Sequence, residues 1–261
     1  MLYGLIGEKL SHSYSKEIHE MISDYTYKIN PVAKEDLDGF MKAKDFKGIN
    51  VTIPYKQEVI PYLDNIDTAA KEIGAVNTIV NDDGVLTGYN TDFAGFLYTL
   101  KKHNINVTGK KVLILGRGGA SKAVIAVLKH LEAREIYTIY HKTADDSISY
   151  DEAFTTHADA DVIVNTTPIG MYPNCDASPV CLTHFPSCQA VVDIIYNPIE
   201  TKLTAQAKEL GMTATTGLDM LVAQAVYASE FFQHKTFYEN ENDYVELIDG
   251  IYDKIAPMLE K

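Results

Sequence analysis

The sequence predicts an α/β protein with two domains, one of which contains a doubly wound parallel sheet. The length of 261 residues is enough for two domains of ordinary size, each with its own core. Residues 111–131 have the pattern of a buried strand, a glycine turn and a helix. After that turn, short apolar strands alternate with helical segments, which is typical of a parallel sheet with helices between its strands.

The first block of the chain is also predicted to alternate strands with helices. Its first expected strands are 2–6 and 25–31, and its first expected helices are 13–23 and 35–44. A helical stretch that ends at Ala70 is followed by residues 74–89, which should form a hairpin around the turn at 82–84. These elements predict an N-terminal α/β domain.

A third strand is expected within residues 48–56. It would place Asn50 and Thr52 on one face, and Pro54 would end it. Lys56 then lies just beyond the carboxyl end of this strand, where open α/β sheets bind ligands. Taken alone, Lys56 would be a solvated surface lysine. Likewise Asp92, taken alone, would be the cap of a helix over 93–100.

Ser13 and Ser15 form a hydroxyl-rich turn at the start of a predicted helix. In isolation this turn is an N-cap with a spare serine. The alternative is that the two hydroxyls and the free N–H groups of the helix receive a carboxylate.

The boundary between the domains is expected within 93–109, where polar residues interrupt the apolar pattern. One domain is assigned to 1–96 together with 218–261, and the other to 97–217. The second domain should contain strands at 112–115, 135–140, 162–164, 190–195 and 213–215, and helices at 120–131 and 201–210. Two final helices, 218–232 and 242–259, are apolar on one side and are expected to fold back onto the first domain.

The glycine turn predicts a dinucleotide site. Gly116, Gly118 and Gly119 allow a sharp turn and a close approach of the backbone to a ligand, and the helix that follows offers its N–H groups to a phosphate. Ser121 stands where the third glycine of the usual fingerprint would be, and its side chain is small enough for close helix packing. No Gly-Lys-Ser/Thr follows, which argues against a nucleoside-triphosphatase loop.

The end of the next strand should contact the adenosine ribose. An acid there would favour NAD, but the sequence has His141, Lys142 and Thr143, which suit the 2′-phosphate of NADP. Asp145 and Asp146 follow at once and weaken the local positive potential. NADP is therefore favoured, NAD stays possible, and an ordinary surface turn is the alternative interpretation.

Charge and composition exclude several classes of partner. The net charge of −13 repels nucleic acid and anionic membranes. No apolar run approaches membrane-spanning length, and no basic segment precedes an apolar one at the N-terminus, so a cytoplasmic protein is expected. Cys175, Cys181 and Cys188 lie close to His184, but their spacing fits no zinc motif, and reduced thiols without a metal are expected.

Taken together, the motifs resemble those of shikimate dehydrogenases across nearly the whole chain. Each motif alone is of limited specificity, but all of them occur in the family's order. They are His12-Ser-Tyr-Ser15, Asn50-Val-Thr-Ile-Pro-Tyr-Lys56, Gly74-Ala-Val-Asn-Thr78, Asn90-Thr-Asp92, Gly116-Arg-Gly-Gly-Ala-Ser121, Asn165-Thr-Thr-Pro-Ile-Gly-Met171 and Gly217-Leu-Asp-Met-Leu-Val-Ala-Gln224.

The resemblance implies NADP-dependent, reversible reduction of 3-dehydroshikimate to shikimate. It also implies a substrate domain made from both chain ends, with a Rossmann-like cofactor domain between them. By the same resemblance, Lys56 and Asp92 are catalytic, and the substrate, a hydroxylated cyclohexene carboxylate, is bound by Ser13, Ser15, Thr52, Asn77, Tyr196 and Gln224. The cofactor is then lined by Gly116, Arg117, Gly118, Gly119, Ala120, Ser121, His141, Lys142, Thr143, Asn165, Thr166 and Gly217.

Some positions depart from the family pattern. Lys16 stands where the family usually has proline, and Arg117 replaces the commoner alanine of the glycine turn. Arg117 is expected either to reach a phosphate or to point to solvent. Asp146 stands where the family has a second basic residue, which weakens selectivity for NADP.

The chemistry predicted for Lys56 is acid/base catalysis at the ketone oxygen, with Asp92 orienting the ammonium group and binding a hydroxyl. Three alternatives share parts of the pattern. A quinate or aminoshikimate dehydrogenase using NAD would share the carboxylate and hydroxyl motifs, whereas a methylene-tetrahydrofolate dehydrogenase would not need the Ser13/Ser15 pair. A metabolite-binding regulatory module without turnover would not need both Lys56 and Asp92. Either a monomer or a homodimer is consistent with the sequence.

Overall fold

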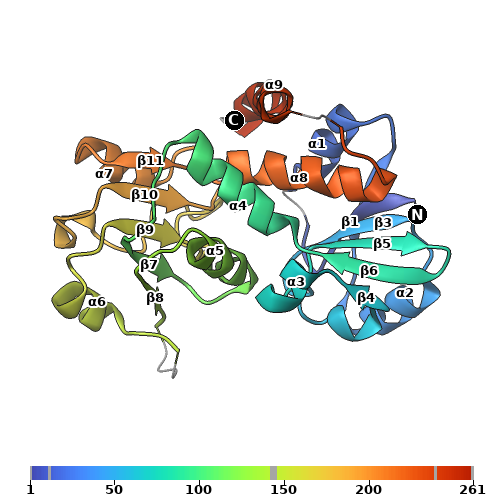
Figure 1. Ribbon diagram of the computed structural model, residues 1–261, viewed down its shortest axis with the longest axis horizontal. Helices are drawn as coiled ribbons and strands as arrows, with labels where there is room; N and C mark the ends of the chain where they lie inside the picture. The colour runs from blue at the N-terminus through green and yellow to red at the C-terminus, as the bar shows by residue number, and fades with distance from the viewer. Residues whose placement is uncertain (1, 11–12, 142–145, 238–239, 260–261) are drawn as a thin grey trace. The chain divides into compact units, whose positions relative to one another are not determined.

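The computed structural model of the chain describes residues 2–10, 13–141, 146–237 and 240–259. Lys142 and Thr143, expected to contact the cofactor, and His12 of the first motif lie outside the described residues. The chain forms two compact units, each with its own sheet (Figure 1). Unit 1 contains the chain up to Gly95 together with Val222–Ile255, and unit 2 contains Phe96–Leu221 and the end of the chain from Ala256.

Unit 1 is built on a mixed sheet of six strands in the order β2-β1-β3-β5-β6-β4. The strands β1, β2 and β3 are parallel, whereas β5 pairs antiparallel with both β3 and β6. The hairpin expected within residues 74–89 is formed by β5 and β6. The strand bounds are β1 Tyr3–Gly7, β2 Tyr27–Pro31, β3 Gly48–Val51, β4 Asn65–Ile66, β5 Thr78–Asp82 and β6 Val85–Tyr89.

Neighbouring residues of the unit 1 strands belong to opposite layers of the core, as the two-residue period of a strand requires. Ile6 and Ile79 pack with residues that include Met41 of α2 (Leu37–Ala43). Leu5 and Val80 pack in a second cluster that includes Phe232. The other helical elements of the first part of unit 1 are α1 Ser15–Ile22, η1 Lys34–Asp36, η2 Ile60–Tyr62 and α3 Thr68–Ile73.

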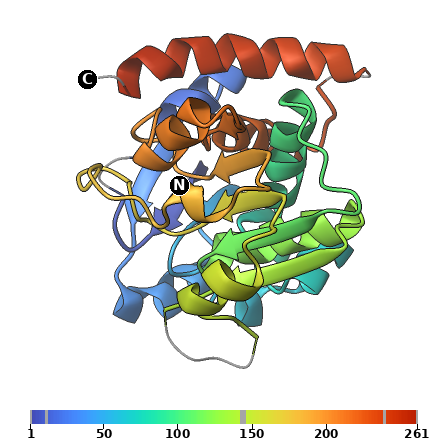
Figure 2. The ribbon, with the colours of Figure 1, turned by 90° about the vertical axis from the view of Figure 1, so that its left-hand side faces the viewer.

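The C-terminal helices contact unit 1, which confirms their expected return to the first domain. The helix α8 (Leu218–Gln233) contributes Ala228 and Phe232 to the cluster around Leu5. The helix α9 (Glu241–Leu259), seen along its whole length in Figure 2, stacks Tyr244 on Tyr227 of α8. The helix α8 is thus attached to the core by its apolar side, and α9 packs on α8.

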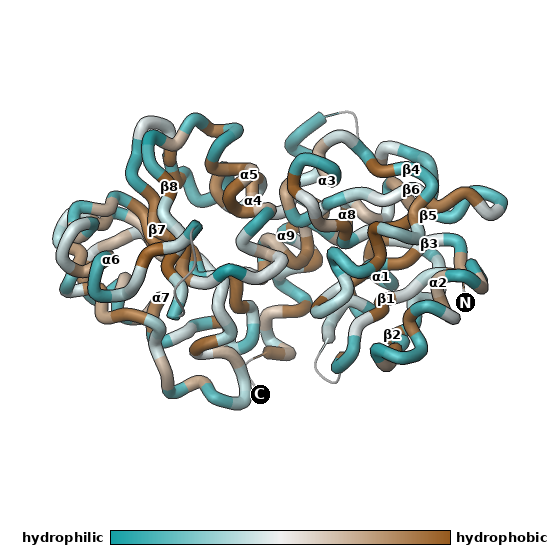
Figure 3. Tube along the Cα trace, turned by 90° about the horizontal axis from the view of Figure 1, so that it is seen from below, coloured by the Kyte–Doolittle hydropathy of each residue, from teal (hydrophilic) through white to brown (hydrophobic). Residues whose placement is uncertain are grey.

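Unit 2 contains five parallel strands in the order β11-β10-β9-β7-β8, which confirms the predicted parallel sheet. The burial of β7 on both faces explains its apolar run, which is mostly brown in Figure 3. The strand bounds are β7 Lys111–Leu115, β8 Glu135–Ile139, β9 Val162–Asn165, β10 Ala190–Asp193 and β11 Thr213–Thr215. The helical elements are α4 Thr91–Lys102, which begins in unit 1, α5 Gly119–His130, α6 Tyr150–Thr156, η3 Leu182–His184 and α7 Lys202–Glu209.

The two points at which the chain enters and leaves unit 2 are joined by charged groups. Asp219, in the first turn of α8, accepts from Lys102 Nζ at 2.7 Å and contacts His103 Nε2 at 2.8 Å. Only 4% of the Asp219 side chain is exposed. Hydrogen bonds and the nearby charges lower the pKa of Asp219 although burial opposes this shift, so the carboxylate stays ionised.

Two local expectations are wrong, and the cap that Asp92 would form if taken alone is not formed. Residues before Ala70 do not form one helix, because the chain makes the short helix η2 around Pro61 and then adds β4 to the edge of the sheet. The strand β3 ends at Val51, so Thr52 lies outside it, in a turn that is closed by the N–H of Tyr55. Asp92 does not cap a helix. The side chain of Asn90 accepts from the N–H of Phe93, which leaves the Asp92 carboxylate for other partners.

His19 of α1 is enclosed by aromatic side chains. Its ring stacks on that of Tyr27 with centroids 4.1 Å apart, and its Nδ1 lies 2.7 Å from the hydroxyl of Tyr25. The residue is fully buried, and this burial lowers the pKa of His19 to about 3. His19 is therefore neutral in the folded protein at ordinary pH.

This burial predicts an acid sensitivity of unit 1. The folded pKa of His19 lies below its unfolded value of 6.5, so its contribution is complete above pH 6.5 and is lost as the pH falls towards about 3. Between pH 7 and pH 5 the free energy of unfolding should fall by about 2 kcal/mol on account of this residue. Because the chain has no tryptophan, urea unfolding is followed by circular dichroism.

The variant His19→Phe, which keeps a ring against Tyr27, should lose this part of the pH dependence. The variant His130→Gln, at an exposed position, serves as the control. An unchanged pH slope in His19→Phe would show that His19 is not the residue responsible.

Candidate functional site

A buried ion pair is the most pronounced polar feature of unit 1. Lys56 Nζ lies 2.5 Å from Asp92 Oδ2, and only 14% and 9% of the two side chains are exposed. Lys56 follows the turn after β3, and Asp92 lies in the first turn of α4. The register of the sheet explains their meeting, because Asn50 pairs with Thr78 and Thr78 with Tyr89, next to the start of α4. The structure thus brings together the two residues expected to be catalytic.

Asn77 holds the other oxygen of Asp92. Its Nδ2 donates to Asp92 Oδ1 at 2.9 Å, and its Oδ1 accepts from the N–H of Thr91 at 2.7 Å. A backbone N–H can only donate, so it fixes which end of the Asn77 amide faces Asp92. Each oxygen of the carboxylate therefore has its own donor: Asn77 on one and Lys56 on the other.

Gln224 reaches the same group from α8. Its Oε1 lies 3.4 Å from the hydroxyl of Thr91, which also accepts from Asn77 Nδ2 at 3.0 Å. Segments far apart in the sequence thus meet in one cluster of Lys56, Asn77, Asp92 and Gln224, with Thr91 between them. Thr91 was not singled out from the sequence, although its place in the Asn90-Thr-Asp92 motif is a usable signal.

Ser13 and Ser15 lie together at the start of α1. Their hydroxyl oxygens are 3.1 Å apart, and Ser13 Oγ accepts from the N–H of Ser15 at 3.2 Å. This contact shows the N-terminal turn expected from the sequence, and it places two hydroxyls side by side. Thr52 is half-buried next to Gly7, so close that a β-carbon on Gly7 would lie 2.6 Å from the Thr52 methyl group.

In unit 2 the glycines of the turn have different reasons to be glycine. Gly116 has a φ of +101°, and a β-carbon there would lie 2.8 Å from Thr167. Gly118 has an ordinary φ of −79°, and a β-carbon there would meet nothing within 4 Å. The fold explains Gly116, whereas the open space at Gly118 suits the close approach of a ligand to the backbone at the start of α5.

Ser121 and Arg117 of the glycine turn have different surroundings and different partners. Ser121 is buried and donates to the carbonyl of Gly118 at 2.6 Å, as the packing role of the third fingerprint position requires. Arg117 is half-exposed and forms two hydrogen bonds with Asp146, from Nε at 3.2 Å and from Nη2 at 2.8 Å. The Asp146 carboxylate thus holds the Arg117 side chain at the surface of the turn.

The loop after β9 is organised by a buried carboxylate. Asn165 is fully buried, donates to Asp193 Oδ1 at 3.0 Å and accepts from the N–H of Thr167 at 3.0 Å. Burial raises the pKa of Asp193 to about 6. Asn165 therefore shapes the loop, and Thr166 is tied through its hydroxyl to the carbonyl of Leu115, beside the glycine turn.

Of the remaining residues of unit 2, Gly217 has a packing role. A β-carbon on Gly217 would lie 1.9 Å from the carbonyl oxygen of Ile194, so no other residue fits there without a shift of the backbone. Tyr196 is half-buried after β10. His141 is exposed at the end of β8, with its ring 4.5 Å from that of Tyr140.

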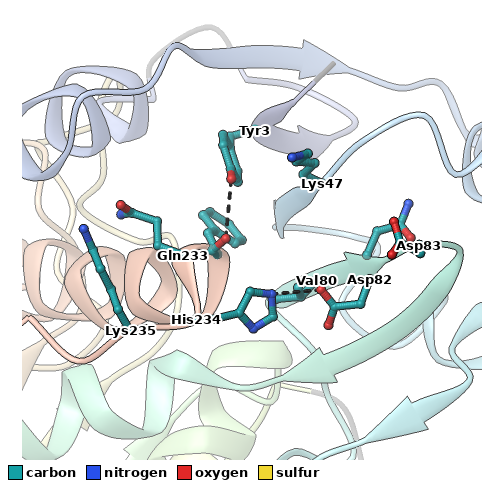
Figure 4. A pocket seen from close by; sticks show the side chains of 10 residues that line it. Tyr3, Lys47, Val80, Asp82, Asp83, Gln233, His234 and Lys235 are labelled. Carbon is teal, nitrogen blue, oxygen red and sulfur yellow. Dashed lines mark hydrogen bonds and ion pairs between the residues drawn. The ribbon is translucent and has the colours of Figure 1, made fainter.

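Unit 1 has a hollow of about 540 Å³, shown in Figure 4, whose lining residues do not include Lys56 or Asp92. It is lined by residues that include Tyr3, Lys47, Asp82 and His234, and His234 Nε2 lies 2.8 Å from Asp82 Oδ1. Lys47 precedes β3 and Asp82 ends the antiparallel β5, whereas Lys56 follows β3 and Asn77 precedes β5. The hollow is therefore at the opposite end of these strands.

The part of the chain that the structure describes contains no group of three or more His, Cys, Asp or Glu side chains able to hold a metal ion. Within the expected thiol-rich loop, Cys188 is buried and donates to the carbonyl of Ala190, whereas Cys181 is exposed near Thr183. None of the helices within the described ranges has the length and apolar character needed to cross a membrane.

Comparisons with known proteins agree with these motifs. Residues 5–79 match the family model of the shikimate dehydrogenase substrate binding domain. The shikimate dehydrogenase (NADP(+)) of Clostridium beijerinckii is 42% identical over 246 residues, which cover 88% of this chain and 91% of the relative.

Solved structures are similar over almost the whole chain. A chorismate mutase/shikimate 5-dehydrogenase fusion protein from Clostridium acetobutylicum has a TM-score of 0.90 and 37% identity, and the match covers 99% of this chain and 98% of that one. Shikimate 5-dehydrogenase from Thermus thermophilus, in complex with NADP(H) and shikimate, has a TM-score of 0.82 and 28% identity, with 96% and 100% covered. The motifs, the sheets of both units and these similarities together show that the chain belongs to the shikimate dehydrogenase family.

Proposed function

We propose that the protein catalyses the NADP-dependent, reversible reduction of 3-dehydroshikimate to shikimate. The observation that carries the proposal is the buried Lys56–Asp92 pair, which gives unit 1 a positioned proton donor. Unit 1, with the match to a substrate binding domain over 5–79, binds the hydroxylated cyclohexene carboxylate. Unit 2, with its glycine turn at the start of α5, binds NADP. The corresponding ranges are 1–96 with 218–261 for substrate and 97–217 for cofactor.

When bound, NADPH supplies the hydride that the ketone carbon accepts. As the carbonyl oxygen gains negative charge, the Lys56 ammonium group donates a proton to it, so that an alcohol and a neutral amine result. Asp92 keeps Nζ in place through Oδ2, while Asn77 holds its other oxygen. In the reverse direction, the neutral amine of Lys56 takes the hydroxyl proton.

The other residues of unit 1 bind and orient the substrate. Ser13 and Ser15 offer two neighbouring hydroxyls to the carboxylate, beside the N–H groups of α1. Asn77, Gln224 and Thr52 offer amide and hydroxyl groups to the ring hydroxyls. Tyr196 of unit 2 closes the carboxylate end in this proposal.

Removal of the Lys56 amine tests the mechanism. In Lys56→Met, kcat for shikimate oxidation should fall about 10²- to 10⁴-fold, because the acid/base step is lost, while KM changes much less. The control is Lys47→Met, an exposed lysine at the other end of β3. The assay follows NADPH absorbance with shikimate and with quinate. A kcat of Lys56→Met within a few-fold of the wild-type value would exclude Lys56 as the acid/base. Faster turnover of quinate than of shikimate by the wild type would identify quinate as the substrate instead.

The glycine turn can be tested without loss of the fold. Gly118→Ala should leave the melting temperature nearly unchanged, because its β-carbon meets open space at an ordinary φ. The same β-carbon should weaken NADP binding about tenfold or more if the diphosphate approaches the backbone here. Gly39→Ala, which also meets nothing within 4 Å, is the matched control. Calorimetric binding of NADP equal to wild type would remove Gly118 from the cofactor site.

A specific observation bears on the rival cofactor NAD. Asp146 holds Arg117 and places a negative charge next to the expected position of the 2′-phosphate, which weakens discrimination against NAD. Asp146→Asn should raise kcat/KM for NADP relative to NAD by up to about fivefold, the effect expected of one exposed charge pair. Asp151→Asn, an exposed acid at the start of α6, is the control. An unchanged ratio would show that this ion pair lies away from the ribose.

A further inference from the structure

Three buried polar residues lie behind Asn77 and Asp92, and the proposed chemistry does not use them. Tyr27 of β2 and Thr78 of β5 are fully buried, and Asn50 of β3 is 5% exposed. A buried polar group without a partner costs free energy, so their hydrogen bonds identify what these groups do. Their side-chain hydrogen bonds include one connected path to the Lys56–Asp92 pair.

The amide of Asn50 has only one possible orientation. Its Nδ2 lies 3.3 Å from the carbonyl oxygen of Asn77, and a carbonyl oxygen can only accept. The same Nδ2 donates to Thr78 Oγ1 at 3.1 Å. The Oδ1 of Asn50 therefore faces the hydroxyl of Tyr27, which donates to it at 2.7 Å.

The hydroxyl of Thr78 passes the series of hydrogen bonds on from Asn50 towards Asn77. Because it accepts from Asn50, its own proton goes to Asn77 Oδ1 at 3.1 Å or to Thr91 Oγ1 at 3.3 Å. The first of these oxygens belongs to Asn77 itself, and the second accepts from Asn77 Nδ2. Donors thus follow one another from Tyr27 through Asn50, Thr78 and Asn77 to Asp92 Oδ1, while Lys56 occupies Oδ2.

Tyr27, the first donor in this series of hydrogen bonds, is neutral and fixed in place. Burial raises the pKa of Tyr27 well above its usual value, so the hydroxyl keeps its proton. The ring is held by its stacking on His19, with an angle of 5° between the planes. Tyr27 therefore stays a donor to Asn50, and the direction of donation along these hydrogen bonds does not reverse in the ordinary pH range.

We propose that Tyr27, Asn50 and Thr78 are positioning residues, which act through Asn77 to hold the Asp92 carboxylate in the orientation that presents Oδ2 to Lys56. The proposal rests on the function proposed above for Lys56 and Asp92. Aligned hydrogen bonds polarise one another, so a donor removed at Tyr27 weakens the bond at Asp92 as well. None of the three touches the reacting atoms in this proposal.

A pair of matched hydroxyl deletions tests the chain. Tyr27→Phe removes the first donor and keeps the ring on His19. Tyr25→Phe is the matched control. It also removes one mostly buried hydroxyl, but this hydroxyl is hydrogen-bonded to His19 and Ser229, which do not belong to the series of bonds from Tyr27 to Asp92. Tyr27→Phe should lower kcat for shikimate oxidation about three- to tenfold with little change in KM. Tyr25→Phe should leave kcat within about twofold. Equal effects of the two variants on kcat would overturn the proposal.

A second pair of variants separates positioning from general loss of stability. Thr78→Val keeps the shape of the side chain and removes the hydroxyl that links the Asn50 amide to the Asn77 side chain. If the bonds act in series, Tyr27→Phe adds nothing to kcat once Thr78→Val is present, although each change still lowers the melting temperature. Independent structural effects would multiply instead, and such multiplication would contradict the proposal.

A readout without turnover keeps this inference distinct from the proposed function. In protein labelled with ¹³C at the lysine ε-carbon, the Lys56 signal is assigned by its loss in Lys56→Met. Its chemical shift should move in Tyr27→Phe and in Thr78→Val and stay in place in Tyr25→Phe. If the wild type did not oxidise shikimate, the proposed function would fail while this result still decided the inference. An unmoved Lys56 signal in Tyr27→Phe would reject it.

Discussion

The site in unit 1 depends on the desolvated contact between Lys56 and Asp92. Two charges taken out of water are stable only when their attraction and additional hydrogen bonds compensate for lost hydration. Here the compensation comes from Asn77, whose amide is oriented by the N–H of Thr91. The beginning of α4, the turn after β3 and the start of β5 must therefore keep their relative places for the ammonium group to stay where it is.

The sequence predicted the architecture well because its signals are local. The apolar run of β7, the glycine turn and the start of α5 follow each other within a few residues, and each signal has one structural meaning. The strand β5 pairs antiparallel with both β6 and β3. The turn between β5 and β6 predicts the first pairing, but no local pattern in the sequence predicts the second. The edge strand β4 has two residues, too few for any periodicity, and was missed for that reason.

The site was predicted in part. Lys56 and Asp92 stand out only through the motifs around them, since either residue alone has an ordinary structural explanation. The positioning role proposed for Tyr27 and Asn50 could not be recognised, because it depends on a register that joins β2, β3 and β5. The pair of Arg117 with Asp146 likewise joins the glycine turn to a loop 29 residues later, and no sequence spacing reveals it.

The contact of Asp219 with Lys102 and His103 has a consequence for how such a chain can arise. It brings residues close to both ends of the 96–221 segment of unit 2 within hydrogen-bonding distance of one another. A segment whose ends adjoin can be spliced into a single loop of a host fold without stretching that fold. A compact unit whose two ends adjoin, as those of unit 2 do, is therefore suited to insertion into a loop of another fold.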